Sequence, residues 1–276
     1  MKIFISDIIR IIKQPEMKVL PANLAFYLVL SLVPILSLVL FLASILPIPY
    51  DLLTNYFDKF IPNDISDFIV MVVSTSNYND GMQLFNVAAL IISSSGMYSI
   101  INVSNAIYNI KSSNIIKDRI KSFVMLFLIL ILMTILVVVL LLGNNILLFC
   151  KEFFPTFISD NLLLIFNILK WPVGMLIIFS TIKLIYTISP SEKMSSKTTT
   201  MGAMFTTVIW IIASLIFGSY LTSFAKYDII YGSLSSIIIL MIWFYILAYI
   251  FVMGMALNYY YSNMENKIIK RDNNKK

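Results

Sequence analysis

Polar side chains inside otherwise apolar stretches are the residues of this chain best placed to do chemistry. Five of them follow one another at three- or four-residue spacing, which is the spacing of one helical face: Ser95, Tyr98, Asn102, Asn105 and Asn109. Three more are each four residues apart in an earlier stretch: Asn23, Tyr27 and Ser31. Such side chains either join helices by hydrogen bonds or line a hydrophilic path through a membrane. Three asparagines on one face indicate a path as readily as helix contacts.

Lys170 is the basic residue placed deepest in an apolar stretch, about nine residues into Leu162–Ile188. An ammonium group at such a depth costs about 2.5–3.5 kcal/mol on membrane-insertion scales. One interpretation is that the side chain snorkels to the outer interface, about 12 Å away along a helix. The other is that it binds an anionic substrate or a lipid phosphate in a cavity. The sequence leaves both open.

The composition argues against several kinds of active site. The chain has no His and a single Cys, Cys150. It therefore has no Ser–His or Cys–His nucleophile pair, no imidazole metal site and no intramolecular disulfide. It also lacks a P-loop, a Gly-x-Gly-x-x-Gly motif and a zinc-protease motif. We predict no catalytic residues, no metal site, no cofactor and no enzyme activity.

Six long apolar runs must position these residues. They are roughly Ala22–Leu46, Leu84–Ile101, Phe123–Phe149, Leu162–Ile188, Met201–Leu221 and Ser233–Leu257. Each reaches or approaches the about 20 residues that a helix needs to cross a bilayer. Backbone groups in lipid must be paired within the segment, which favours helices. The sequence predicts an all-α polytopic membrane protein with six transmembrane helices, in which Pro34, Pro172 and Gly232 permit helix distortion.

The basic residues predict the orientation. The N-terminal segment, the second and fourth connections and the tail hold 15 of the 20 Lys and Arg residues. The opposite side holds three, together with most of the acidic loop residues. Since basic loops stay in the cytoplasm, both termini should be cytoplasmic. The net charge of +6 then follows from topology and does not indicate a nucleic-acid partner.

The chain reads as a single membrane domain, residues 1–276. Residues 1–20 contain an amphipathic segment, typical of a helix in the cytoplasmic interface. Residues 22–257 form the six-helix bundle. Its outer loop, residues 47–83, is structured as two short amphipathic helices that lie on the leaflet or cap the bundle. Residues 258–276 form a basic cytoplasmic tail. We find no removable signal peptide, because the first apolar run is too long.

Three stretches resemble the YihY/BrkB family of bacterial inner-membrane proteins. The segment Ala22–Pro34 is similar to the family's Leu-Ala-Phe-Tyr opening, and Tyr231–Leu234 running into Ile239–Asn258 is similar to its closing signature. Between them, Ser95-Gly96, Asn105–Tyr108 and Gly202-Ala203 resemble its middle landmarks. The resemblance covers nearly the whole chain, and implies a six-helix protein of the cytoplasmic membrane without an agreed activity.

Two positions depart from the family's pattern. The family usually has Pro before the Gly-Ala pair, where this chain has Met201, and Glu in the last motif, where it has Ala256. Any role of that acidic residue is absent here. The resemblance also implies an old ribonuclease label and an association with virulence or serum resistance. The missing His, carboxylate cluster and cytosolic domain oppose a nuclease.

The leading hypothesis is a transport-class protein, a permease or a flippase-like mover of a lipid or amphiphilic anion. Membrane lipids are then its expected partners. Its path would be lined by Tyr27, Ser31, Asn102, Asn105 and Lys170. The chief alternative is a non-transport scaffold for envelope assembly, or for virulence-associated resistance, and a membrane hydrolase ranks third. The substrate, the driving ion and the oligomeric state are not predicted.

Overall fold

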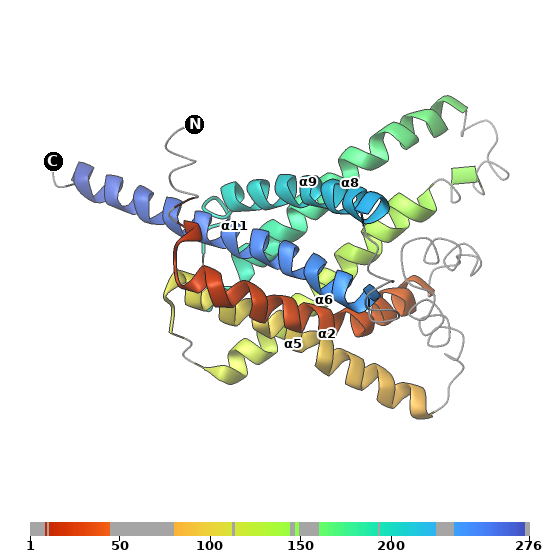
Figure 1. Ribbon diagram of the computed structural model, residues 1–276, viewed down its shortest axis with the longest axis horizontal. Coiled ribbons are helices and arrows are strands. Elements are labelled where there is room, and N and C mark those ends of the chain that lie inside the picture. The colour runs from red at the N-terminus through yellow and green to blue at the C-terminus, as the bar shows by residue number, and fades with distance from the viewer. Residues whose placement is uncertain are drawn as a thin grey trace. The chain divides into compact units, whose positions relative to one another are not determined.

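The computed structural model describes residues 9, 11–44, 80–111, 114–143, 147–148, 160–192, 194–224 and 235–273. Every regular element within these residues is helical. The helices, in chain order, are α2 (Glu16–Ser44), α5 (Asp80–Tyr108), α6 (Ile115–Val137), the π-helical η1 (Val138–Leu142), α8 (Asp160–Ile188), α9 (Thr200–Phe224) and α11 (Ser235–Asn273) (Figure 1).

The described parts of all six apolar runs lie in helices, as predicted. Within the part of the chain that the structure describes, five segments are long and apolar enough to cross a membrane: Val87–Tyr108, Ile115–Leu140, Leu162–Ile188, Thr200–Tyr220 and Ile237–Ser262. The remaining helix, α2, has 29 residues and is therefore about 43 Å long, more than a hydrocarbon core requires. The predicted all-α polytopic fold is confirmed.

Two helices extend well beyond their apolar runs. α5 continues past Ile101 to Tyr108, and ends where Asn109 adopts a positive φ of 54°. The amide of Ile110 then donates to the carbonyl of Asn105 at 2.9 Å, which caps the helix end. α11 runs past Leu257 to Asn273, a stretch without Gly or Pro to interrupt it. Hydropathy marks the apolar part of a helix, whereas breakers and caps mark its end.

The chain divides into two compact units, which are described separately. Unit 1 comprises Met1–Leu30, Ser94–Met125 and Ile182–Lys276, and unit 2 comprises Ser31–Ser93 and Leu126–Thr181. The single membrane domain with an N-terminal interfacial segment and a basic tail remains a prediction. The proposed outer-loop helices, most of the interfacial segment and Gly232 lie outside the described residues.

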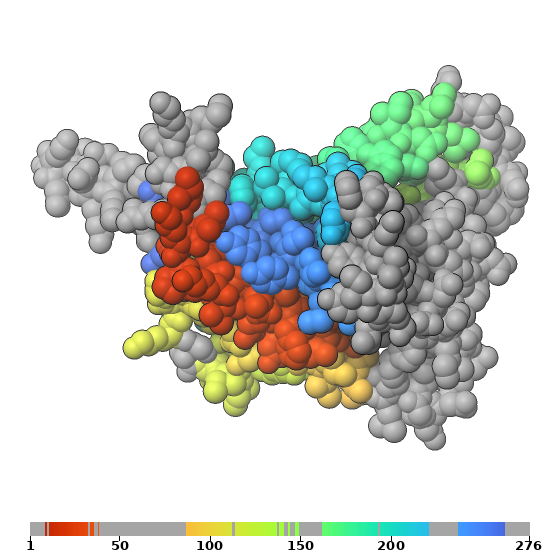
Figure 2. Space-filling view, viewed as in Figure 1, coloured from red at the N-terminus to blue at the C-terminus, as the bar shows by residue number. Residues whose placement is uncertain are grey.

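Close packing of α9 on α11 forms much of the core of unit 1. A Cβ on Gly202 would meet the backbone oxygen of Gly254, and a Cβ on Gly254 would meet the hydroxyls of Thr206 and Tyr186. In the space-filling view the described atoms of α9 (teal) and α11 (blue) pack together without a gap (Figure 2). Glycine is needed at both positions because the two backbones approach so closely.

In unit 2, η1 and the residue after it pack against α8. Gly174 contacts Leu140, whose Cδ2 lies 3.0 Å from the position of a Cβ on this glycine, and Gly143 lies against the ring of Phe166. The other face of α8 is apolar and open, with Ile168 71% exposed and Trp171 63% exposed. Such a face is suited to acyl chains. Pro172, inside α8, removes one backbone donor from the helix.

Candidate functional site

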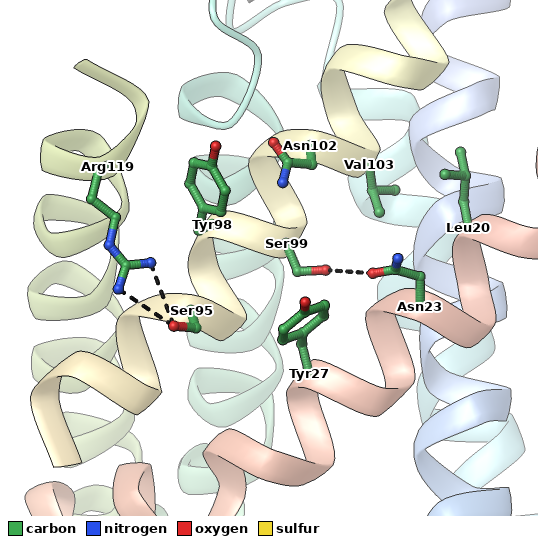
Figure 3. A pocket seen from close by; sticks show the side chains of 9 residues that line it. All are labelled: Leu20, Asn23, Tyr27, Ser95, Tyr98, Ser99, Asn102, Val103 and Arg119. Carbon is green, nitrogen blue, oxygen red and sulfur yellow. Dashed lines mark hydrogen bonds between the residues drawn. The ribbon is translucent and has the colours of Figure 1, made fainter. Parts of the chain in front are cut away.

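A half-open cavity of about 250 Å³ lies in unit 1 between α2, α5 and α6. Figure 3 shows its nine lining residues, which are Leu20, Asn23, Tyr27, Ser95, Tyr98, Ser99, Asn102, Val103 and Arg119. Seven of these side chains are polar, and Arg119 is the charged one among them. The described lining therefore combines one cation with hydroxyl and amide groups and includes no carboxylate.

Helical periodicity brings the α5 contribution together. Ser95, Ser99 and Asn102 recur at spacings of four and three residues, so their side chains project from one face. Asn23 and Tyr27, one turn apart on α2, face them across the cavity (Figure 3). The Ser99 hydroxyl donates to Asn23 Oδ1 at 3.3 Å and joins the two helices. Helical spacing in the sequence predicted a polar face on each of these two helices. In the structure the two faces line the same cavity.

Arg119 enters the cavity from the first turns of α6. Asn114 caps this helix, because its Oδ1 accepts from the amides of Ile116 at 2.9 Å and Lys117 at 3.3 Å. The guanidinium points at Ser95, and both terminal nitrogens lie 3.4 Å from its Oγ (Figure 3). The start of α6 therefore fixes the register that aims this side chain at α5.

Two aromatic rings hold the guanidinium of Arg119. Its Cζ lies 5.7 Å from the centroid of Tyr98 and 5.6 Å from that of Phe123, within the range of cation–π attraction. Ser95 lies about 12 Å along α5 from Val87, where the apolar span begins. Arg119 is the fifth residue of the span Ile115–Leu140, and its guanidinium reaches the level of Ser95 in the α5 span, where two rings and a hydroxyl hold it. Such a charge is costly there unless it has a role.

Asp118, next to Arg119, belongs to a different group of contacts. Its Oδ1 accepts from the Ser191 hydroxyl at 2.8 Å, and Asn105 Oδ1 accepts from the Ser191 amide at 2.8 Å. The Asn105 amide group also donates to Ser191 Oγ at 2.7 Å. Lys121 donates to the carbonyls of Ser189 and Pro190. We call these residues the 189–191 clasp, since they fix the connection after α8 to α5 and α6.

The predicted site residues therefore separate into several places. Tyr27 and Asn102 line the cavity, whereas Asn105 belongs to the 189–191 clasp. Ser31 is fully buried in unit 2. Lys170, also in unit 2, donates to Asn167 Oδ1 at 2.9 Å. Pro34 lies within α2, and Pro172 within α8. The structure brings two of the five predicted path residues to one cavity.

The residue that sequence reasoning missed is Arg119. In the sequence it stands among the basic residues of the second connection, Lys111, Lys117 and Lys121, which predict orientation. Two signals distinguish it from them. It is the one arginine among these four basic residues, and Phe123 lies one turn further along the same helix.

The last family-like motif, Ile239–Asn258, forms a packing contact between α11 and α9, and not an active site. Asn258 is fully buried, and its Oδ1 accepts from the amide of Gly202 at 2.7 Å, near the start of α9. Tyr186 donates to the carbonyl of Phe251 at 2.7 Å and shares a bond of the same length with Thr206. Ala256 is also buried, 2% exposed. These contacts explain chemically why Gly and Asn stand at these positions.

Comparison with known proteins agrees with this architecture. The family model described as "Virulence factor BrkB" matches residues 8–276. The ribonuclease-like protein YfkH of Bacillus subtilis is 32% identical over 241 residues, which cover 86% of this chain and 87% of YfkH.

Two further relatives carry the name UPF0761 membrane protein. One from Coxiella burnetii is 33% identical over 100 residues, 33% of this chain and 36% of its own length. One from Chromobacterium violaceum is 24% identical over 262 residues, 91% of this chain and 60% of its own length. No solved structure matches the chain. The match over almost its full length and the spanning helices identify the chain as a multi-pass membrane protein of the BrkB family.

Proposed function

We propose that this protein is a non-enzymatic transporter that binds an amphiphilic anion in the cavity between α2, α5 and α6 and moves it across or within the membrane. The observation that carries the proposal is Arg119, a cation among six other polar side chains inside a spanning segment. An intramembrane charge that lines a cavity is a hallmark of substrate and ion pathways.

The surroundings of the cavity suit an amphiphilic substrate. Phe26, beside Tyr27 on α2, is 52% exposed, and Val124, beside Phe123 on α6, is 51% exposed. The same two helices thus offer polar groups to a head group and apolar groups to a hydrocarbon tail.

Several observations favour transport over catalysis. The sequence has no His, and the described cavity lining has no carboxylate and no Cys. The polar groups present are hydroxyls, amides and a guanidinium, which bind a ligand without supplying a general base near neutral pH. The ribonuclease-like name of one relative belongs to that protein, and we disfavour nuclease activity here.

Complementation of a deletion strain tests the proposal. Leaflet-resolved labelling of anionic lipids, with untargeted lipid profiling, should show an altered distribution in the deletion strain that the parent gene restores. Arg119→Gln should fail to restore it, while the protein accumulates in the membrane at the parental level. Lys117→Gln is the matched control, because it removes an exposed charge two residues away on the same helix.

The scaffold alternative predicts the opposite result for Arg119→Gln. A scaffold that organises other envelope proteins has no need of a cation inside this cavity. Arg119→Gln would then restore the deletion strain as well as the parent does, and the lipid distribution would be unaltered in both. That pair of results would refute transport through this site.

A further inference from the structure

The fork of Arg119 points its two terminal nitrogens at Ser95 over long contacts. Both terminal nitrogens lie 3.4 Å from the one oxygen of Ser95. Charge-assisted bonds from guanidinium to an anionic oxygen measure about 2.7–2.9 Å, and a fork fits two oxygens at once. A group with two adjacent anionic oxygens matches this geometry better than the serine hydroxyl does. Carboxylates and phosphates both qualify.

The rest of the lining distinguishes between these two anions. Beyond the Arg119 fork stand the amides of Asn23 and Asn102 and the hydroxyls of Tyr27 and Ser99. A fatty-acid carboxylate offers two oxygens and nothing further for these groups to bind. A phosphate ester offers additional oxygens, and a polyol attached to it offers hydroxyls. The described lining includes no anionic side chain to attract the ammonium of a zwitterionic head group.

The size of the cavity limits what it can enclose. Cavities that bury a drug-sized ligand measure about 300–1,000 Å³. At about 250 Å³, this one holds a head group, and the tails of an amphiphile must remain outside it. The exposed Phe26 and Val124, next to lining or ring residues on α2 and α6, suit tails that remain in lipid.

Resting on the proposed function, we infer that this cavity binds the head group of an anionic glycerophospholipid, with the phosphate on the Arg119 fork and the polyol hydroxyls on Asn23, Ser99 and Asn102. Tyr98 and Phe123 hold the guanidinium in the orientation that the phosphate requires. The exposed lysines of the same region, such as Lys117, add only unspecific attraction to an anionic leaflet.

Binding measurements on the full-length protein in nanodiscs test this inference. The discs contain phosphatidylcholine with graded phosphatidylglycerol, phosphatidic acid or oleate, and retained lipid is counted by native mass spectrometry after mild detergent release. We expect phosphatidylglycerol to be retained preferentially. Arg119→Gln should weaken its retention by about tenfold or more, which is about 1.4 kcal/mol, and Arg119→Lys should weaken it less. Lys117→Gln should leave it unchanged.

Soluble competitors separate a lipid head group from a free phosphate ester. Glycerol 1-phosphate at millimolar concentration should compete only weakly, since it lacks the tails. Displacement of phosphatidylglycerol by micromolar glycerol 1-phosphate would overturn the lipid assignment. Oleate retained as well as phosphatidylglycerol would overturn the phosphate assignment. Equal losses in Arg119→Gln and Lys117→Gln would show unspecific charge attraction and overturn the site.

The two proposals fail in different ways. If Arg119→Gln abolishes complementation while phosphatidylglycerol retention stays at the parental level, the lipid assignment is wrong and transport through the cavity stands. If retention depends on Arg119 but the variant complements fully, the lipid site stands and the transport proposal is wrong.

Discussion

At the scale of single residues, the neighbours of a basic side chain show whether it can bind a ligand. Lys170 lies deepest in an apolar stretch of the sequence, and in the structure it contacts Asn167 on its own helix. The sequence places Arg119 among the loop charges that predict orientation, whereas its guanidinium contacts two rings and lines the cavity. Depth along one helix is readable from the sequence. The sequence does not show which neighbouring helix supplies the partners, because the contacts of Arg119 with α5 join residues 21 and 24 positions apart.

The ring of Tyr98 provides a test of how Arg119 is held. Tyr98→Leu removes the cation–π contact, worth about 0.5–2 kcal/mol, and should weaken retention of phosphatidylglycerol severalfold. Tyr98→Phe keeps the ring and should retain the lipid at or near the parental level. Both variants are compared by native mass spectrometry in matched nanodiscs. Equal weakening in the two would show that the hydroxyl, and not the ring, is what matters.

Asn102 and Asn105, three residues apart, should behave in opposite ways. Asn102 lines the cavity with an exposed side chain, so Asn102→Ala should lower lipid retention with little effect on thermal unfolding. Asn105 is buried and makes two hydrogen bonds in the 189–191 clasp. Asn105→Ala should therefore cost about 1–3 kcal/mol of stability, visible as a lower unfolding temperature in detergent. A reversed pattern would contradict the separation of the two residues.

At the scale of elements, the sequence predicted the helices and could not predict their contacts. The apolar runs located all six, because hydropathy and backbone pairing in lipid leave few alternatives. The length of α11 was underestimated, since its last part is polar. The face shared by Ser95 and Asn102 was foreseen from periodicity. Two contacts could not be foreseen, because they depend on tertiary packing. One is the hydrogen bond from this face of α5 to Asn23, and the other is the hydrogen bond between Asn105 and Ser191.

The α9–α11 contact offers a test with an internal control. A methyl group on Gly254 would collide with Thr206 and Tyr186, which are themselves hydrogen-bonded. Gly254→Ala should therefore destabilise the protein by about 1–3 kcal/mol, measured by thermal unfolding in detergent. At Gly218, on the same α9, nothing lies within 4 Å of an added Cβ. Gly218→Ala should leave stability unchanged or slightly higher, because Ala favours a helix. Equal effects would refute close packing at Gly254.

At the scale of the whole molecule, charge distribution predicts the orientation in the membrane. Without Arg119, the N-terminal segment, loops and tail on the predicted cytoplasmic side still carry 14 Lys and Arg residues, against three on the other side. In a Cys150→Ser background, a cysteine introduced between Asp51 and Asp80 should react with an impermeant thiol reagent in intact cells. A cysteine at position 197 should react only after permeabilisation. The reverse pattern would invert the orientation.

The central claim is that an anionic lipid occupies the cavity lined by Arg119, and photo-crosslinking tests it most directly. A phosphatidylglycerol analogue with a diazirine on its head group is irradiated with the full-length protein in membranes, and labelled peptides are mapped by mass spectrometry. The account predicts labelling within residues 20–27 and 95–103 that is competed by unlabelled phosphatidylglycerol and lost in Arg119→Gln but kept in Lys117→Gln. Labelling centred on the Lys170 segment of α8, unaffected by Arg119→Gln, would contradict it.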